Sequence, residues 1–202
     1  MIRITPDARL LAAPFRTYHV LARQNGRSPA TEWTHVLARI ALCAAIAGTA
    51  TAAAATGRIS WSLALSGTLC WLPLIALQLL TAACVILPLS HLGTLAPWHP
   101  STLFALFFQS HAPWSLWVLA VCAFVLIAPA LASDDIIMAT GLVPLAWTTV
   151  LVCAYFREVL GLRRRAALMA ALVHQLMATA LIVAYIAWAV QLWPRLIGLR
   201  VP

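Results

Sequence analysis

The sequence predicts an all-α protein: a polytopic helical membrane protein with about five transmembrane helices, an N-terminal amphipathic helix and a short interfacial helix. Composition is the first reason, because 63% of the 202 residues are hydrophobic and only 9% are charged, unlike a soluble domain. The second reason is the spacing of the charges. Between residues 36 and 193, apolar runs reach the roughly 20 residues that cross a bilayer core of about 30 Å, and charges fall almost only between them.

The segment over residues 1–35 is polar and basic, and we expect it to be cytoplasmic. Pro14 suits the first turn of a helix, and apolar side chains around it recur at helical spacing. These observations predict a short amphipathic helix over roughly 14–24 that lies on the membrane surface. The apolar positions are Leu11, Phe15, Tyr18, Leu21 and Ala22.

The membrane bundle is predicted over 36–193, and its first span covers 36–56. Small residues recur on this span at every fourth position, and such a stripe lets another helix approach closely. Ala44, Gly48 and Ala52 therefore form a predicted helix-packing face.

The second span lies within 59–87, where 29 residues carry no charge. At 1.5 Å per residue this run is about 43 Å long, which is too long for an upright span. We therefore expect the helix to tilt, to protrude or to kink at Pro73.

A proline-rich connector over 88–113 follows the second span. Within it, residues 101–109 are apolar but too few to cross a bilayer, which predicts an interfacial or re-entrant helix capped by Ser101. Three further spans are expected over 115–132, 136–156 and 167–193, the last of them stopped by Pro194. Residues 194–202 then form a short outer tail.

Arginine counting predicts the orientation of the chain. With the N-terminus in the cytoplasm, ten arginines fall on the inner side and three on the outer side, and an odd number of spans then places the C-terminus outside. The expected location is a bacterial inner membrane. The inner residues are Arg3, Arg9, Arg16, Arg23, Arg27, Arg39, Arg157, Arg163, Arg164 and Arg165, and the outer residues are Arg58, Arg195 and Arg200. Arg39, one turn inside the first span, is expected to snorkel to the interface.

The net charge of +8 would suggest a nucleic-acid partner in a soluble protein. Here the arginines cluster beside membrane segments, so anionic lipid headgroups are the expected partner and nucleic acid is not. Arg163, Arg164 and Arg165 are the candidate headgroup contacts, but a role as topology anchor also explains them and is the favoured interpretation.

Two kinds of side chain raise the question of a metal or cofactor. Asp134 and Asp135 are paired carboxylates, but a helix cap by Ser133 or Asp134 explains them without a cation. His174 is predicted about two turns inside the last span, beside Gln175, and an ionisable group within a span is a functional hypothesis by default.

A haem or metal would need a second ligand at the depth of His174. The other candidates, His35 and His111, are predicted at cytoplasmic membrane edges, and no metal-ligand spacing such as HxxxH occurs. We therefore predict no cofactor. The favoured interpretation is hydrogen bonding between helices by His174, Gln175 and Gln78.

The order of elements resembles the Yip family of five-span membrane proteins and their bacterial relatives. The resemblance rests on Pro14-Phe15 in an N-terminal interfacial helix, on a connector that ends in His111-Ala112-Pro113, and on the loop Phe156–Ala167 with its Leu-Gly followed by Arg-Ala. It implies five spans, a cytoplasmic N-terminus and a non-enzymatic role in membrane organisation or protein association.

No Gly-rich phosphate loop, nucleophile elbow or His/Glu metal helix occurs, so we expect no enzyme activity. The preferred hypothesis is a scaffold or accessory subunit that associates with other membrane protein subunits. One alternative is a small permease, motivated by Pro73, Pro144 and the polar residues of the spans, and it predicts a polar path through the bundle. The other is a haem-binding electron-transfer subunit, which predicts a visible absorbance band.

Overall fold

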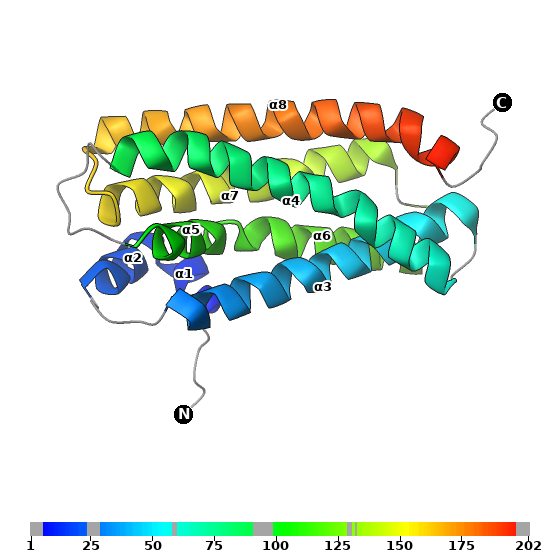
Figure 1. Ribbon diagram of the computed structural model, residues 1–202, viewed down its shortest axis with the longest axis horizontal. Helices are drawn as coiled ribbons and strands as arrows, with labels where there is room; N and C mark the ends of the chain where they lie inside the picture. The colour runs from blue at the N-terminus through cyan, green and yellow to red at the C-terminus, as the bar shows by residue number, and fades with distance from the viewer. Residues whose placement is uncertain are drawn as a thin grey trace.

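A computed structural model of the chain describes residues 6–23, 29–57, 60–90, 99–128, 131 and 133–196, and this part folds into helices (Figure 1). The helices are α1 (Pro6–Ala12), α2 (Pro14–Arg23), α3 (Pro29–Thr56), α4 (Trp61–Ser90), α5 (Pro100–Gln109), α6 (Ala112–Ile127), α7 (Asp134–Glu158) and α8 (Arg164–Leu196).

The long helices α3, α4, α6, α7 and α8 lie side by side, and the short helices α1, α2 and α5 gather at one end of the bundle (Figure 1). We call this the α5 end. The chain leaves it along α3, returns along α4, leaves again through α5 and α6, returns along α7 and leaves along α8. This order brings the α7–α8 loop and the start of α3 to the α5 end.

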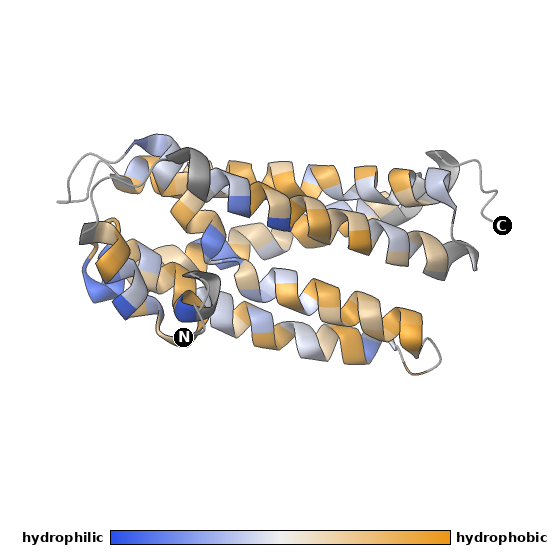
Figure 2. Ribbon diagram, turned by 90° about the horizontal axis from the view of Figure 1, so that it is seen from below, coloured by the Kyte–Doolittle hydropathy of each residue, from blue (hydrophilic) through white to orange (hydrophobic). Residues whose placement is uncertain are grey.

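Four helices are long and apolar enough to cross a membrane, namely α3, α4, α7 and α8. The pair α5 and α6 meets at an angle of 44° and together forms a fifth candidate, a broken span or a re-entrant loop. Apolar residues run along the whole bundle, whereas hydrophilic residues gather around α1 and α2 (Figure 2). The predicted all-α class is confirmed, and four to five candidate spans are compatible with a multi-pass membrane protein.

Several predicted boundaries differ from the structure. Helix α8 continues to Leu196, past Pro194, because a proline disturbs the turn before it without ending the helix at once. The N-cap of α5 is His99 rather than Ser101, and the His99 ring accepts from the Ser101 amide while Pro100 occupies the first turn. Helix α7 is capped by Ser133 as expected, through the amide of Ile136 at 3.4 Å.

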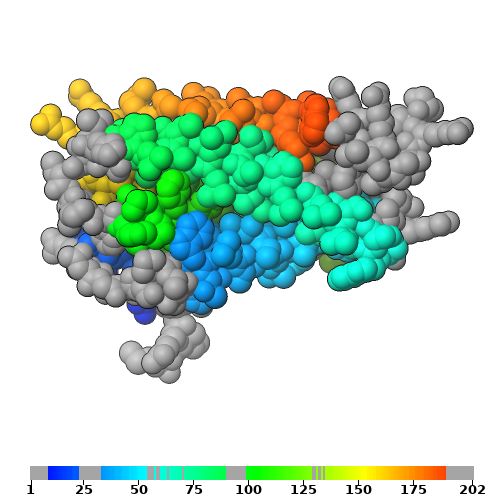
Figure 3. Space-filling model, viewed as in Figure 1, coloured from blue at the N-terminus to red at the C-terminus, as the bar shows by residue number. Residues whose placement is uncertain are grey.

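The main core lies at the α5 end. Helix α5 contacts α3, α4 and α7, and Figure 3 shows it between α3 and α4 on the face drawn there. Almost all of α5 is buried, including Leu103, Leu106 and Phe107. The apolar face of α2 belongs to the same core, because Tyr18 and Leu21 pack there with residues of α5 and α7.

Helices α3 and α4 cross with their backbones in contact. A side chain added at Gly48 would collide with the backbone of Gly67 and Thr68 in α4. Ala44 and Ala52 are buried on either side of Gly48. The small residues of the first span thus form a close helix–helix contact within this chain.

Candidate functional site

The break between α5 and α6 is the centre of the polar structure inside the bundle. The Ser110 amide donates to the Phe107 carbonyl at 3.0 Å instead of continuing the α-helical ladder to Leu106. This tight last turn leaves the Leu106 carbonyl oxygen without its helical donor. The Tyr18 hydroxyl, from α2, donates to that oxygen at 2.9 Å.

Two more side chains donate to backbone carbonyls of α5, one near its C-terminal end and one inside the helix. The Arg39 guanidinium, from α3, donates to the carbonyl of Phe108. A cation beside the C-terminal end of a helix is favoured by the helix dipole. Tyr155, from α7, donates to the Leu103 carbonyl at 3.0 Å. Arg39, expected to snorkel outward, is turned toward the interior in order to make this contact.

A pair of buried histidines lies at the turn between α5 and α6. His111 precedes α6 and His174 lies in α8, and their Nε2 atoms are 3.4 Å apart. The exposed fractions are 7% for His111 and 0% for His174. The ring of Phe107 lies 4.9 Å from both imidazoles, centroid to centroid.

The hydrogen bonds around His111 assign the protons of the pair. The Ser110 hydroxyl donates to the Phe107 carbonyl at 2.6 Å, so its oxygen is left to accept. His111 Nδ1 lies 3.1 Å from that hydroxyl and 3.3 Å from the Phe107 carbonyl, and both oxygens require a proton on Nδ1. His111 Nε2 is then an acceptor, and His174 Nε2–H is the donor. His174 Nδ1 becomes an acceptor with no hydrogen-bond partner among the described residues.

The geometry of the pair bears on the cofactor hypothesis. Two nitrogens 3.4 Å apart match one edge of a tetrahedral zinc site, for which bond lengths are about 2.0–2.1 Å. Among the described residues, however, no third His, Cys, Asp or Glu joins the two. A haem plane would have to pass between rings whose nitrogens are in hydrogen-bond contact. His35 lies exposed on α3 and outside the pair.

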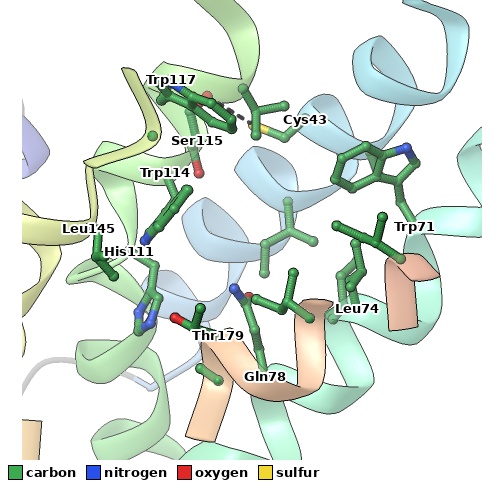
Figure 4. A pocket seen from close by; sticks show the side chains of 18 of the residues that line it. Cys43, Trp71, Leu74, Gln78, His111, Trp114, Ser115, Trp117, Leu145 and Thr179 are labelled. Carbon is green, nitrogen blue, oxygen red and sulfur yellow. Dashed lines mark hydrogen bonds between the residues drawn. The ribbon is translucent and has the colours of Figure 1, made fainter. Parts of the chain in front are cut away.

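A cavity of about 450 Å³ opens beside the histidine pair (Figure 4). All five long helices contribute to its wall, and most of the wall is aliphatic or aromatic. Its polar groups gather toward the α5 end, where Figure 4 shows His111, Thr179 and Gln78 close together. Gln175 also lines the cavity, is 7% exposed, and its Nε2 atom has no hydrogen-bond partner in the described structure.

The charged residues of the α5 end form a separate group on the outside of the bundle. Arg163, Arg164 and Arg165 are exposed where α8 begins. Nearby, Glu158 pairs with His19 at 3.0 Å, which ties the end of α7 to α2. Four of the arginines counted for the orientation lie outside the described residues: Arg3, Arg27, Arg58 and Arg200.

The sequence alone singles out His174 and Gln175. Of the other two candidate ligands, His35 and His111, the structure brings His111 to them. Length and hydropathy place His111 at a membrane edge, since residues 101–109 are too few to cross a bilayer. Since α5 enters the bundle, the turn after it lies at the level of His174. The apolar–proline pattern of residues 100–113 was the signal for a re-entrant helix.

Fold and site together define an all-helical protein with four to five candidate membrane spans and a polar cluster inside the bundle. Comparisons with protein-family models, with curated proteins and with solved structures find no match for this chain. The resemblance to the Yip family therefore remains a prediction.

Proposed function

We propose that this chain is a non-catalytic integral membrane protein that acts as a scaffold or accessory subunit of a membrane protein assembly. The observation that carries the proposal is the use of the buried polar side chains. Tyr18, Arg39 and Tyr155 each donate to a backbone carbonyl of α5. These groups stabilise the architecture of the bundle, where an enzyme would direct them toward a substrate.

The one arrangement that resembles a nucleophile with its base is Ser110 and His111, with Oγ and Nδ1 3.1 Å apart. Nucleophilic catalysis needs a hydroxyl whose proton passes to the base and a path for substrate. The Ser110 hydroxyl instead donates to the Phe107 carbonyl, and Ser110 is fully buried. The pair therefore supports a structural role.

The proposal includes an orientation with the N-terminus in the cytoplasm and the C-terminus outside, in a bacterial inner membrane. The exposed arginines of the α5 end support it, because positive residues favour the cytoplasmic side. Arg163, Arg164 and Arg165 are proposed to contact anionic lipid headgroups there. The remaining apolar surface is available to lipid and to other membrane subunits.

Transport is less well supported. A permeation path for a polar solute needs polar groups along its length, whereas the cavity carries them mainly toward the α5 end. Beyond them its wall is formed by side chains such as Val118, Leu142 and Ile186.

The scaffold proposal is tested by purifying the tagged chain from its native membrane into nanodiscs and measuring the mass of the particles by native mass spectrometry. The expected result is one or more membrane partners at a fixed ratio to the 21.8 kDa chain, retained after dilution. An unrelated five-span protein with the same tag, purified in parallel, identifies non-specific passengers. A free chain without a partner at fixed ratio would refute the proposal.

A further inference from the structure

The cavity has the form of a site for an amphipathic molecule. Its volume of about 450 Å³ lies within the range of about 300–1,000 Å³ that is usual for small-molecule pockets. Its long wall is apolar, and three tryptophans line it: Trp71, Trp114 and Trp117. A molecule that fills this space must therefore be largely hydrocarbon.

The polar part of the wall specifies the head of that molecule. Gln175 lines this part of the wall, and its amide nitrogen is buried and has no hydrogen-bond partner in the described structure. A buried donor left without an acceptor costs about 1–3 kcal/mol, so a ligand acceptor at this point is stabilising. Arg39 brings a positive charge to the same wall, and no Asp or Glu is among its described residues. The wall thus favours an acceptor-rich or anionic head.

The depth of the site in the membrane narrows the class of ligand further. Gln175 is eleven residues beyond Arg164, the first residue of α8. At 1.5 Å per residue it lies about 16 Å along the helix, near the middle of a hydrocarbon core of about 30 Å if Arg164 marks the interface. A phospholipid keeps its headgroup at the interface and would not bring it to this depth. A compact head such as a carboxylate or a quinone carbonyl would reach it.

We propose that the cavity binds a membrane-soluble amphiphile with a carbonyl-type acceptor head, which Gln175 hydrogen-bonds beside His111 and Arg39, and an apolar body along the tryptophan-lined wall. This binding does not require the scaffold role, because the site lies within a single chain. A fatty acid carboxylate and a quinone carbonyl share the required chemistry, and the experiment separates them.

The experiment measures binding of oleate, of a decyl-benzoquinone and of octadecene to the purified full chain in phosphatidylcholine nanodiscs, by native mass spectrometry. Wild type is expected to bind a single molecule of oleate or of quinone saturably. Gln175→Leu should weaken that binding by about tenfold, the effect of losing one hydrogen bond to the head. Octadecene, which has no head, should show no difference between wild type and Gln175→Leu.

A matched pair of variants on α8 tests the location. Ala178 lines the cavity, whereas Ala180 is exposed on the same helix. Ala178→Leu fills the site and should abolish saturable binding, and Ala180→Leu should leave the dissociation constant within about twofold. Wild type that binds neither oleate nor quinone saturably would overturn the proposal, as would binding that is equal in wild type, Ala178→Leu and Gln175→Leu. If Ala178→Leu fails to fold by circular dichroism, Gln175→Leu alone decides.

Discussion

At the scale of single residues, the pair formed by His111 and His174 decides whether this bundle holds a cofactor or a hydrogen bond. The protons assigned above make His174 Nε2–H the donor to His111 Nε2. Such bonds between membrane helices are worth about 0.6 kcal/mol on average, because the unfolded chain in the membrane also finds partners. The hydrogen bond between the two histidines therefore orients α6 against α8 and adds little to the free energy of unfolding.

The substitution His174→Gln should be mild, with a loss of less than about 1 kcal/mol of unfolding free energy, because a glutamine amide can still donate to His111 Nε2. His174→Leu should cost about 1–2 kcal/mol, since it leaves that buried acceptor without a donor. Denaturation in mixed micelles, followed by circular dichroism, measures both. A Soret band or stoichiometric metal in wild type that His174→Gln removes would contradict the hydrogen-bonded assignment.

Residue type alone was enough to single out His174 and Gln175, because polar side chains in an apolar helix are conspicuous. Their partner could not be found in the same way. His111 lies 63 positions away in sequence, and its depth depends on whether α5 enters the bundle, which length and hydropathy do not decide.

At the scale of the elements, α5 is the helix on which the architecture depends. Its carbonyl oxygens accept side-chain donors from α2, α3 and α7. A break inside a membrane bundle is tolerated only where the freed backbone groups find partners. The freed group here is the Leu106 carbonyl, so the Tyr18 hydroxyl is a condition for α5 and α6 to act as one broken span.

Tyr18→Phe should lower the unfolding free energy by about 1–2 kcal/mol, because the Leu106 carbonyl has lost its helical donor and depends on the tyrosine hydroxyl. Tyr155→Phe is the matched control. It removes a bond to Leu103, which lies inside α5 and keeps its helical donor, so a loss of about 0.5 kcal/mol is expected. Equal losses in the two variants, measured by denaturation, would mean that the tight last turn of α5 does not control the effect.

The crossing of α3 and α4 gives a second prediction. Gly48→Ala should destabilise the protein by about 3 kcal/mol, because the added methyl group meets the backbone of Gly67 and Thr68, which cannot move aside. Gly141→Ala is the control, since its nearest neighbour is a Trp117 ring carbon at 3.6 Å, an ordinary contact. It should be neutral, or stabilising by up to about 1 kcal/mol. Thermal unfolding in one detergent compares the two variants. A melting temperature of Gly48→Ala equal to that of wild type would show that the two backbones do not touch.

The sequence was a good guide to the long helices and to the close contact on the first span, and a poor one to the burial of the short helix α5. The long apolar helices follow from run length, and the stripe of Ala44, Gly48 and Ala52 follows from spacing. The burial of α5 does not follow, because it depends on bonds such as Tyr18 to Leu106, which are 88 positions apart. Helix α1, with seven residues, is too short for periodicity to reveal it.

At the scale of the whole molecule, the number of membrane crossings depends on α5 and α6. If the pair crosses as one broken span, the chain has five crossings and its ends lie on opposite sides of the membrane. If the pair re-enters and returns, four crossings remain and both ends lie on the same side. Only five crossings put the arginines of α1, α2 and the α7–α8 loop on one side of the membrane, which the positive-inside rule assigns to the cytoplasm.

Reporter fusions after Pro202 distinguish these two topologies most directly. One fusion carries a fluorescent protein that matures only in the cytoplasm, and the other carries a phosphatase that is active only outside it. A broken span predicts phosphatase activity without fluorescence, and the reverse result when the same reporters are joined to the N-terminus. Fluorescence without phosphatase activity at the C-terminal fusion would contradict the broken span, and with it the central claim that α5 and α6 cross the membrane together.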